Sequence, residues 1–202
     1  MRGENTEVQV AEAVSVLFNA PMNAIYTLLV IYIRSEPSTP ALHLLVGVLF
    51  SGILPMVVIY AMFRRGVISD IYASDRQSRL TPFLGALVCY AVGLAALISL
   101  GSPFVLVSLM ACYLGNTLAM ALISTRWKIS IHAAGIAGPS AFLIRQIDAG
   151  LWPFSLLTIP ICWARWRLKA HSVGQLATGV VLTAVLTLVQ VEFYGWLWLS
   201  RP

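Results

Sequence analysis

The segment from Ala164 to Gln175 contains three side chains whose spacing suits chemistry on an anionic group. Arg165 is followed by His171 six positions later and by Gln175 four positions after that. A guanidinium is a planar donor suited to phosphate oxygens, and an imidazole can act as a nucleophile or a proton carrier. On a helix Gln175 would share a face with His171 and could fix the ring in one tautomer, as the third member of a triad does. The alternative interpretation is a basic loop that only sets membrane topology.

The composition indicates that this segment belongs to a membrane protein. The chain has 202 residues, of which 59% are hydrophobic and only 10% are charged, whereas soluble domains have about 25% charged residues. Several apolar runs reach about 20 residues, the length that spans a bilayer. Because a spanning segment must satisfy its own backbone hydrogen bonds, we expect an all-α polytopic bundle forming one integral membrane domain over residues 1–202.

About six or seven membrane helices are expected, after a short polar lead at residues 1–12. Their approximate bounds are 13–33, 41–63, 83–100, 104–124, 133–149, 151–163 and 176–199. A kink is expected at Pro55. Arg145 and Asp148 are three positions apart and could form an ion pair on one helix.

Three charged loops lie between these helices, at 64–82, 125–132 and 164–175. Two helices separate each loop from the next, so all three are expected at the same membrane face. Two histidines among several cations suit phosphoryl transfer, because the cations stabilise the nonbridging oxygens while the histidines attack phosphorus and carry protons. The candidate side chains are Asp70, Asp75, Arg76, Arg79, Lys128, Ser130, His132, Arg165, His171 and Gln175.

In order and spacing, the loops resemble the type 2 phosphatidic acid phosphatase superfamily, which includes lipid phosphate phosphatases and histidine-dependent haloperoxidases. Its third motif is Ser-Arg, five residues, His, three residues, Asp, and residues 164–175 match its Arg and His. Its second motif is Pro-Ser-Gly-His, and residues 129–132 match its Ser and His. The first motif, Lys, six residues, Arg-Pro, has a loose counterpart in 75–82. The resemblance covers about 70–190, inside a phosphatase-like core of about 64–199.

The resemblance implies a role for each matching residue in a metal-independent phosphoric monoester hydrolase without a cofactor. His171 would be the nucleophile that forms a phosphohistidine, and His132 the general acid. Gln175 stands where the family has Asp, and an amide cannot stabilise an imidazolium as a carboxylate does. Either Asp70 or Asp75 compensates, or the nucleophile is weaker, or hydrolysis is lost. The expected phosphate-binding residues are Arg165, Ser130, Lys128, Arg79 and Arg76.

The expected substrate is a lipid phosphate that reaches the site from the membrane, because the chain has no soluble cap. Phosphatidate, phosphatidylglycerol phosphate and polyprenyl phosphates or diphosphates all fit, and the apolar helices do not select among them. Membrane lipids are the expected partners, nucleic acid is not expected, and the oligomeric state is left open. One alternative is a Mg²⁺-dependent membrane prenyltransferase that uses Asp70 and Asp75. Another is an inactive transport or lipid-binding bundle, which Gln175 favours.

The distribution of basic residues predicts the side on which the site lies. The expected site face carries ten of the 13 basic residues, and six against three remain when the four candidate ligands Arg76, Arg79, Lys128 and Arg165 are set aside. Because basic residues concentrate in cytoplasmic loops, we expect a cytoplasmic site in the plasma membrane of a prokaryote. Many members of the family that the motifs resemble work on the opposite face.

Overall fold

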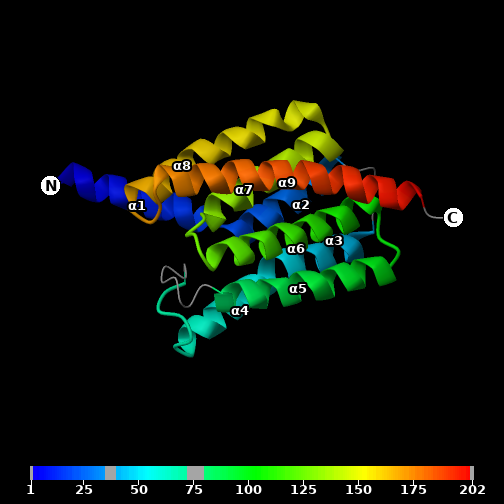
Figure 1. The fold of residues 1–202 in the computed structure, drawn as a ribbon, viewed down its shortest axis with the longest axis horizontal. Coiled ribbons are helices and arrows are strands. Elements are labelled where there is room, and N and C mark those ends of the chain that lie inside the picture. Colours follow the sequence, from blue (N-terminus) through cyan, green and yellow to red (C-terminus); the bar gives the residue numbers. More distant parts are fainter. Residues whose placement is uncertain (1, 35–39, 72–79, 201–202) are drawn as a thin grey trace.

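The computed structural model describes residues 2–34, 40–71 and 80–200, and the described chain is a bundle of helices without strands (Figure 1). This confirms the all-α class. In chain order the elements are α1 (Arg2–Leu17), α2 (Ala20–Arg34), α3 (Ala41–Val48), the π-helical turn η1 (Leu49–Ile53), α4 (Leu54–Arg64), α5 (Leu80–Ser99), α6 (Phe104–Ser124), α7 (Ile131–Gln146), the 3₁₀ helix η2 (Ala149–Leu157), α8 (Thr158–Arg167) and α9 (Val173–Leu199).

Four helices in the described chain are long and apolar enough to cross a membrane, which indicates a membrane protein. They are the continuous helix Ala41–Arg64, made of α3, η1 and α4, and the helices α5, α6 and α9. The α1–α2 pair is a fifth candidate if it is counted as one bent span. The helices expected at 133–149 and 151–163 correspond to α7, which has 16 residues, and to η2 with α8, which changes helix type at Thr158.

The first expected span is broken into two helices that are bent by 56° at Phe18–Asn19. The Asn19 side-chain oxygen accepts the backbone N–H of Met22 at 2.9 Å, which caps the start of α2. Pro21 in the first turn favours a new helix there. The segment expected as a polar lead is part of α1, which packs on α8 and extends beyond the bundle in Figure 1. Arg167 holds it through an ion pair with Glu7 at 2.8 Å.

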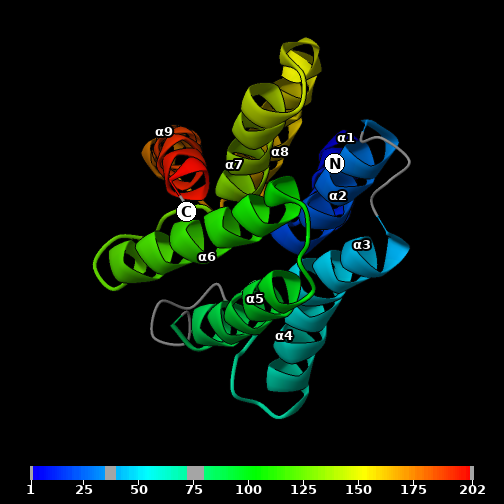
Figure 2. The same ribbon diagram turned by 90° about the vertical axis from the view of Figure 1, so that its right-hand side faces the viewer.

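The second span contains a π-helical turn, η1, which ends at Ile53, two positions before Pro55. Proline has no backbone N–H to donate, and a wider turn is one way in which a helix accommodates this loss. Beyond η1, α4 packs mainly on α5, whereas η1 itself still packs on α2. Figure 2 shows α4 running away from α2 and α8 below this point.

The connections gather at two ends of the bundle (Figure 1). Residues 65–71 after α4, the α6–α7 connection and the α8–α9 connection lie at one end, which we call the loop end. The α5–α6 and α7–η2 connections lie at the other, which we call the turn end. The larger hydrophobic core packs helices α2, α5, α6, α7 and α9 toward the turn end, with Leu28, Leu97, Leu109, Phe142 and Leu143 among its buried members.

Two ion pairs also tie the turn end together, and they correct the expected pair between Arg145 and Asp148. Arg145 instead pairs with Glu192 on α9 at 2.6 Å, and Asp148 pairs with Arg34 at the end of α2 at 3.3 Å. The reason is that α7 ends at Gln146, so Asp148 has left the helix. It adopts extended backbone and caps η2, where its Oδ1 accepts the N–H of Gly150.

Candidate functional site

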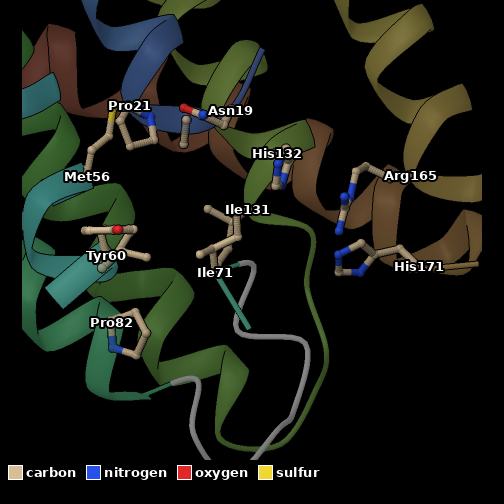
Figure 3. Close-up of a pocket in the computed structure, with 12 residues that line it drawn as sticks. Asn19, Pro21, Met56, Tyr60, Ile71, Pro82, Ile131, His132, Arg165 and His171 are labelled. Carbon is tan, nitrogen blue, oxygen red and sulfur yellow. The ribbon is translucent and has the colours of Figure 1, made fainter. Parts of the chain in front are cut away.

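A pocket of about 250 Å³ at the loop end brings together residues from the second motif, at 129–132, and the third motif, at 164–175. One wall carries His132 from the start of α7, Arg165 from α8 and His171 from the α8–α9 connection. Figure 3 shows the guanidinium of Arg165 beside the imidazole of His171, with His132 nearby on α7. The facing wall is largely apolar and is formed by Pro21, Met56, Tyr60 and Pro82. The lining is completed by Asn19, Ala20, Ile59, Ile71 and Ile131.

The backbone at the end of α8 turns His171 back toward Arg165. Lys169 has a left-handed backbone with φ of 52°, and its N–H donates to the carbonyl of Trp166. The N–H groups of Ala170 and His171 both donate to the carbonyl of Arg165, at 3.0 and 3.4 Å. This is the Schellman arrangement that ends many helices. The five residues between Arg165 and His171 are therefore the number needed for the chain to reverse direction and return the His171 N–H to the Arg165 carbonyl.

His132 is placed by the cap of α7. Ser130 is fully buried, and its side-chain oxygen accepts the N–H of Ala133 at 3.4 Å. The Ser130 N–H in turn donates to the carbonyl of Gln175 at 3.4 Å, which joins the start of α7 to the start of α9. A Cβ added at Gly179 would lie 2.8 Å from the carbonyl oxygen of Ser130. Only glycine lets α9 approach this closely, and small residues commonly permit such helix contacts in membranes.

Gln175 occupies a helix cap in the structure. Its side-chain oxygen accepts the N–H of Ser172 at 3.1 Å, and its own N–H donates to the Ser172 hydroxyl at 3.3 Å. This reciprocal capping box begins α9. The structure thus gives Gln175 a positioning role: its side chain fixes the first turn of α9, while its carbonyl holds the His132 segment. A hydrogen bond from the His171 ring N–H to the Gln175 amide oxygen, as expected from the sequence, stays a prediction.

The three polar side chains of the pocket are largely buried. The exposed fractions of His132, Arg165 and His171 are 9%, 5% and 6%. Electrostatic interactions are stronger where water is excluded, so a guanidinium in this position binds an anion more strongly than one on the surface does. Two imidazoles beside it can exchange protons or attack an electrophile near neutral pH. The wall can therefore bind a small anion and act on it.

The other predicted site residues do not line this pocket or lie outside the described residues. Ser130 is buried behind His132 as a cap, and Lys128 is half-buried in the α6–α7 connection. Asp70 is half-buried and accepts a hydrogen bond from the Ser69 hydroxyl at 3.4 Å. The candidates outside the described residues, whose roles stay predictions, are Asp75, Arg76 and Arg79.

Sequence reasoning missed the apolar wall. Met56 and Tyr60 lie within the span expected at 41–63, and only their four-residue spacing, which places them on one helix face, distinguishes them. Asn19 and Pro21 lie within the continuous span expected at 13–33, although an Asn two positions before a Pro is a helix-start signal. Pro82 ends the counterpart of the first motif and was not proposed as a lining residue. Because Pro82 lines the pocket, the segment at 75–82 contacts the site through at least this residue.

Comparisons with protein-family models, with curated proteins and with solved structures found no match for this chain. A functional assignment therefore depends on the motifs in the sequence and on the geometry of the pocket.

Proposed function

We propose that the protein is an integral membrane lipid phosphate phosphatase that hydrolyses a phosphomonoester or diphosphate of a lipid. The observation that carries this proposal is the meeting of His132, Arg165 and His171 at one buried wall. Two of these residues come from the motif at 164–175 and the third from the motif at 129–132, with most of α7, η2 and α8 between them in sequence. A shared pocket is what the resemblance to phosphatidic acid phosphatases requires of these motifs.

The proposed reaction has two steps. A ring nitrogen of His171 attacks phosphorus and forms an N–P bond, while the P–O bond to the lipid breaks and His132 donates a proton to the leaving oxygen. Water then attacks the phosphohistidine with His132 as the base, and inorganic phosphate leaves. Arg165 binds nonbridging oxygens and stabilises their charge in both transition states.

The apolar wall supports a lipid-borne substrate. The exposed fractions of Met56 and Tyr60 are 39% and 56%, so these residues face outward as well as into the pocket. A lipid moving sideways from the bilayer would meet α4 before it met the histidines. In this proposal α7 and the η2–α8 pair cross the membrane beside α9, which gives six embedded helices, or seven with the bent α1–α2 pair. The site then lies at one membrane face, the cytoplasmic face according to the basic residues.

A lipid-binding bundle without turnover is the second candidate. The observation that favours it is Gln175, which replaces a carboxylate and serves as a helix cap here. Phosphate release distinguishes the two candidates. We expect purified protein to release phosphate from a polyprenyl phosphate or phosphatidate in the presence of EDTA, with inhibition by vanadate, which mimics pentacoordinate phosphorus. Binding without release would favour the second candidate, and release only with added Mg²⁺ would favour the prenyltransferase alternative.

The nucleophile is tested by His171→Ala. Loss of a nucleophile should lower turnover by at least about a thousandfold. His43→Ala is the matched control, because His43 lies near the start of α3, outside the pocket. Near-normal release by His171→Ala would refute the assignment.

The guanidinium is tested by Arg165→Lys, which keeps the charge but removes the planar pair of donors. We expect turnover to fall by about a hundredfold, as when one transition-state donor is lost. Arg167→Lys is the control in the same turn of α8, because Arg167 pairs with Glu7 and does not line the pocket. Equal effects of the two changes would argue against a phosphate-binding role for Arg165.

A further inference from the structure

A second cavity of about 100 Å³ continues from the pocket into the bundle. We call it the inner cavity. The two spaces share part of their lining, so they meet along a common boundary. The shared residues are Ala20, Pro21, Ile59, Pro82 and Ile131.

The inner cavity runs along the bundle axis toward the turn end. On α5 its lining extends from Pro82 to Tyr90, and on α7 from Ile131 to Pro139. Eight residues of helix correspond to about 12 Å. This is more than a third of a hydrocarbon core of about 30 Å, so the cavity reaches well beyond the level of the histidines.

The walls of the inner cavity are mainly apolar, and the far end is polar. Phe83, Ala86, Met120 and Ala134 are among the side residues. At the far end, Asn116 donates to the hydroxyl of Thr187 at 2.8 Å and accepts from the Gln190 amide at 2.9 Å. The Asn116 side chain is thus held in contacts between α6 and α9, and together with the rings of Tyr90 and Tyr113, whose centroids lie 5.8 Å apart, it closes the far end as a fixed floor.

We propose that the inner cavity receives one apolar chain of the lipid whose phosphate occupies the pocket. The inference rests on the proposed function for the position of the phosphate. A lipid whose phosphate lies at Arg165 and His171 would extend its chain across the pocket toward Ile131 and Pro82, which line both spaces. From there a single chain can enter the inner cavity, which runs on toward the turn end. The polar floor at Asn116 limits how far the chain extends. The favoured substrate class is therefore a lipid phosphate that binds through a single chain.

Chain burial makes a quantitative prediction for binding. Each buried methylene contributes about 0.8 kcal/mol, which is about a fourfold change in affinity. Dodecyl phosphate carries a chain long enough to cross the apolar part of the pocket and fill the inner cavity, whereas the chain of butyl phosphate ends within the pocket. We expect the wild-type protein to bind dodecyl phosphate much more tightly than butyl phosphate.

The test fills the cavity at a distance from the pocket. Ala86 on α5 lines the inner cavity but not the pocket, so Ala86→Phe should exclude the chain and leave the phosphate site open. We expect it to weaken dodecyl phosphate binding by about tenfold to a hundredfold, the loss of two to three buried methylenes, with butyl phosphate binding unchanged. Val88→Phe is the control, because Val88 lies on the same helix and is 64% exposed.

Equilibrium binding of radiolabelled dodecyl phosphate and butyl phosphate is measured on protein in nanodiscs of zwitterionic lipid. Empty nanodiscs serve as the blank. Equal dodecyl phosphate binding by Ala86→Phe and Val88→Phe would overturn the proposal, as would an equal loss of both probes in Ala86→Phe. Ala86→Leu is the smaller substitution if the phenylalanine variant does not fold. Phosphate release is followed in the same samples: chain-selective binding without release would refute the proposed function while supporting the inner cavity as a chain site.

Discussion

The two ends of the bundle are built differently. At the turn end, large side chains such as Phe142 and Leu143 are fully buried, and the ion pairs Arg34–Asp148 and Arg145–Glu192 connect helices across the surface. At the loop end the buried cluster is smaller, and two joined cavities take up part of the interior. The same helices run through both ends, so the difference comes from side-chain size and from the departure of α4 after η1.

Because of this difference, one end of the bundle mainly stabilises the fold and the other mainly provides the candidate site, although the same helices form both. Close packing stabilises a structure because each buried side chain makes many dispersion contacts, and a cavity gives up those contacts. The loop end therefore contributes less to stability, but it provides room for a ligand. Substitutions at the two ends should consequently have different signatures.

The largest expected effect on stability is at the turn end. Phe142→Ala should lower the free energy of unfolding by about 3–5 kcal/mol, because a fully buried ring is removed and a cavity is left. Turnover per folded molecule should change little, since Phe142 lies more than two helical turns from His132 along α7. Denaturation in detergent and active-site titration would measure the two quantities separately. A large loss of turnover in the folded variant would show that the ends are coupled.

A smaller effect is expected where α9 meets α7 at the loop end. Gly179→Ala places a Cβ 2.8 Å from the Ser130 carbonyl oxygen, so backbone must move and His132 moves with it. We expect a loss of about 1–3 kcal/mol together with lower turnover. Gly85→Ala is the control: its Cβ would lie 2.7 Å from a methyl group of Val58, a side-chain atom on α4. If turnover fell equally in both variants, the close contact between α7 and α9 would not be what holds His132 in place.

The smallest effect is expected at Gln175. Gln175→Leu removes the side-chain half of the capping box and should cost about 0.5–1 kcal/mol, whereas Gln175→Glu keeps an acceptor at a position where glutamate also caps. If Gln175 acts only by positioning α9, Glu should restore both stability and turnover. Turnover that rises above wild type in Gln175→Glu would instead indicate a charged acceptor for His171, the role expected from the sequence. Thermal unfolding and phosphate release at one pH would separate these outcomes.

Much of the fold followed from the sequence because apolar length is a strong signal. The span expected at 104–124 agrees with α6, and those at 41–63, 83–100 and 176–199 agree with their helices to within a few residues. The break at Phe18–Asn19 was missed because it depends on one side-chain cap inside an apolar run. The π-helical turn before Pro55 was also missed, since hydrophobicity alone does not distinguish π-helix from α-helix.

The polar wall of the site was predictable, and the apolar wall was not. His132, Arg165 and His171 are rare residue types in a membrane protein, so their spacing was informative. Met56 and Tyr60 resemble any lipid-facing side chains, and their contact with the pocket follows from the course of α4, which no local pattern specifies. The capping role of Gln175 was hidden for another reason: its spacing from His171 suggested a shared helical face, but the helix begins only at Val173.

The reversal at the end of α8 determines which sequence changes the site can accept. The N–H groups of Ala170 and His171 share the carbonyl of Arg165, so the segment between Arg165 and His171 closes a ring of fixed size. Inserting or deleting one residue there would break that ring and turn the histidine away, even if both site residues were kept. The identities of the intervening residues are much freer, apart from position 169, where the left-handed backbone favours glycine or asparagine over a branched side chain. In comparisons among distant sequences, the length of this segment should therefore be a more reliable guide to the site than its composition.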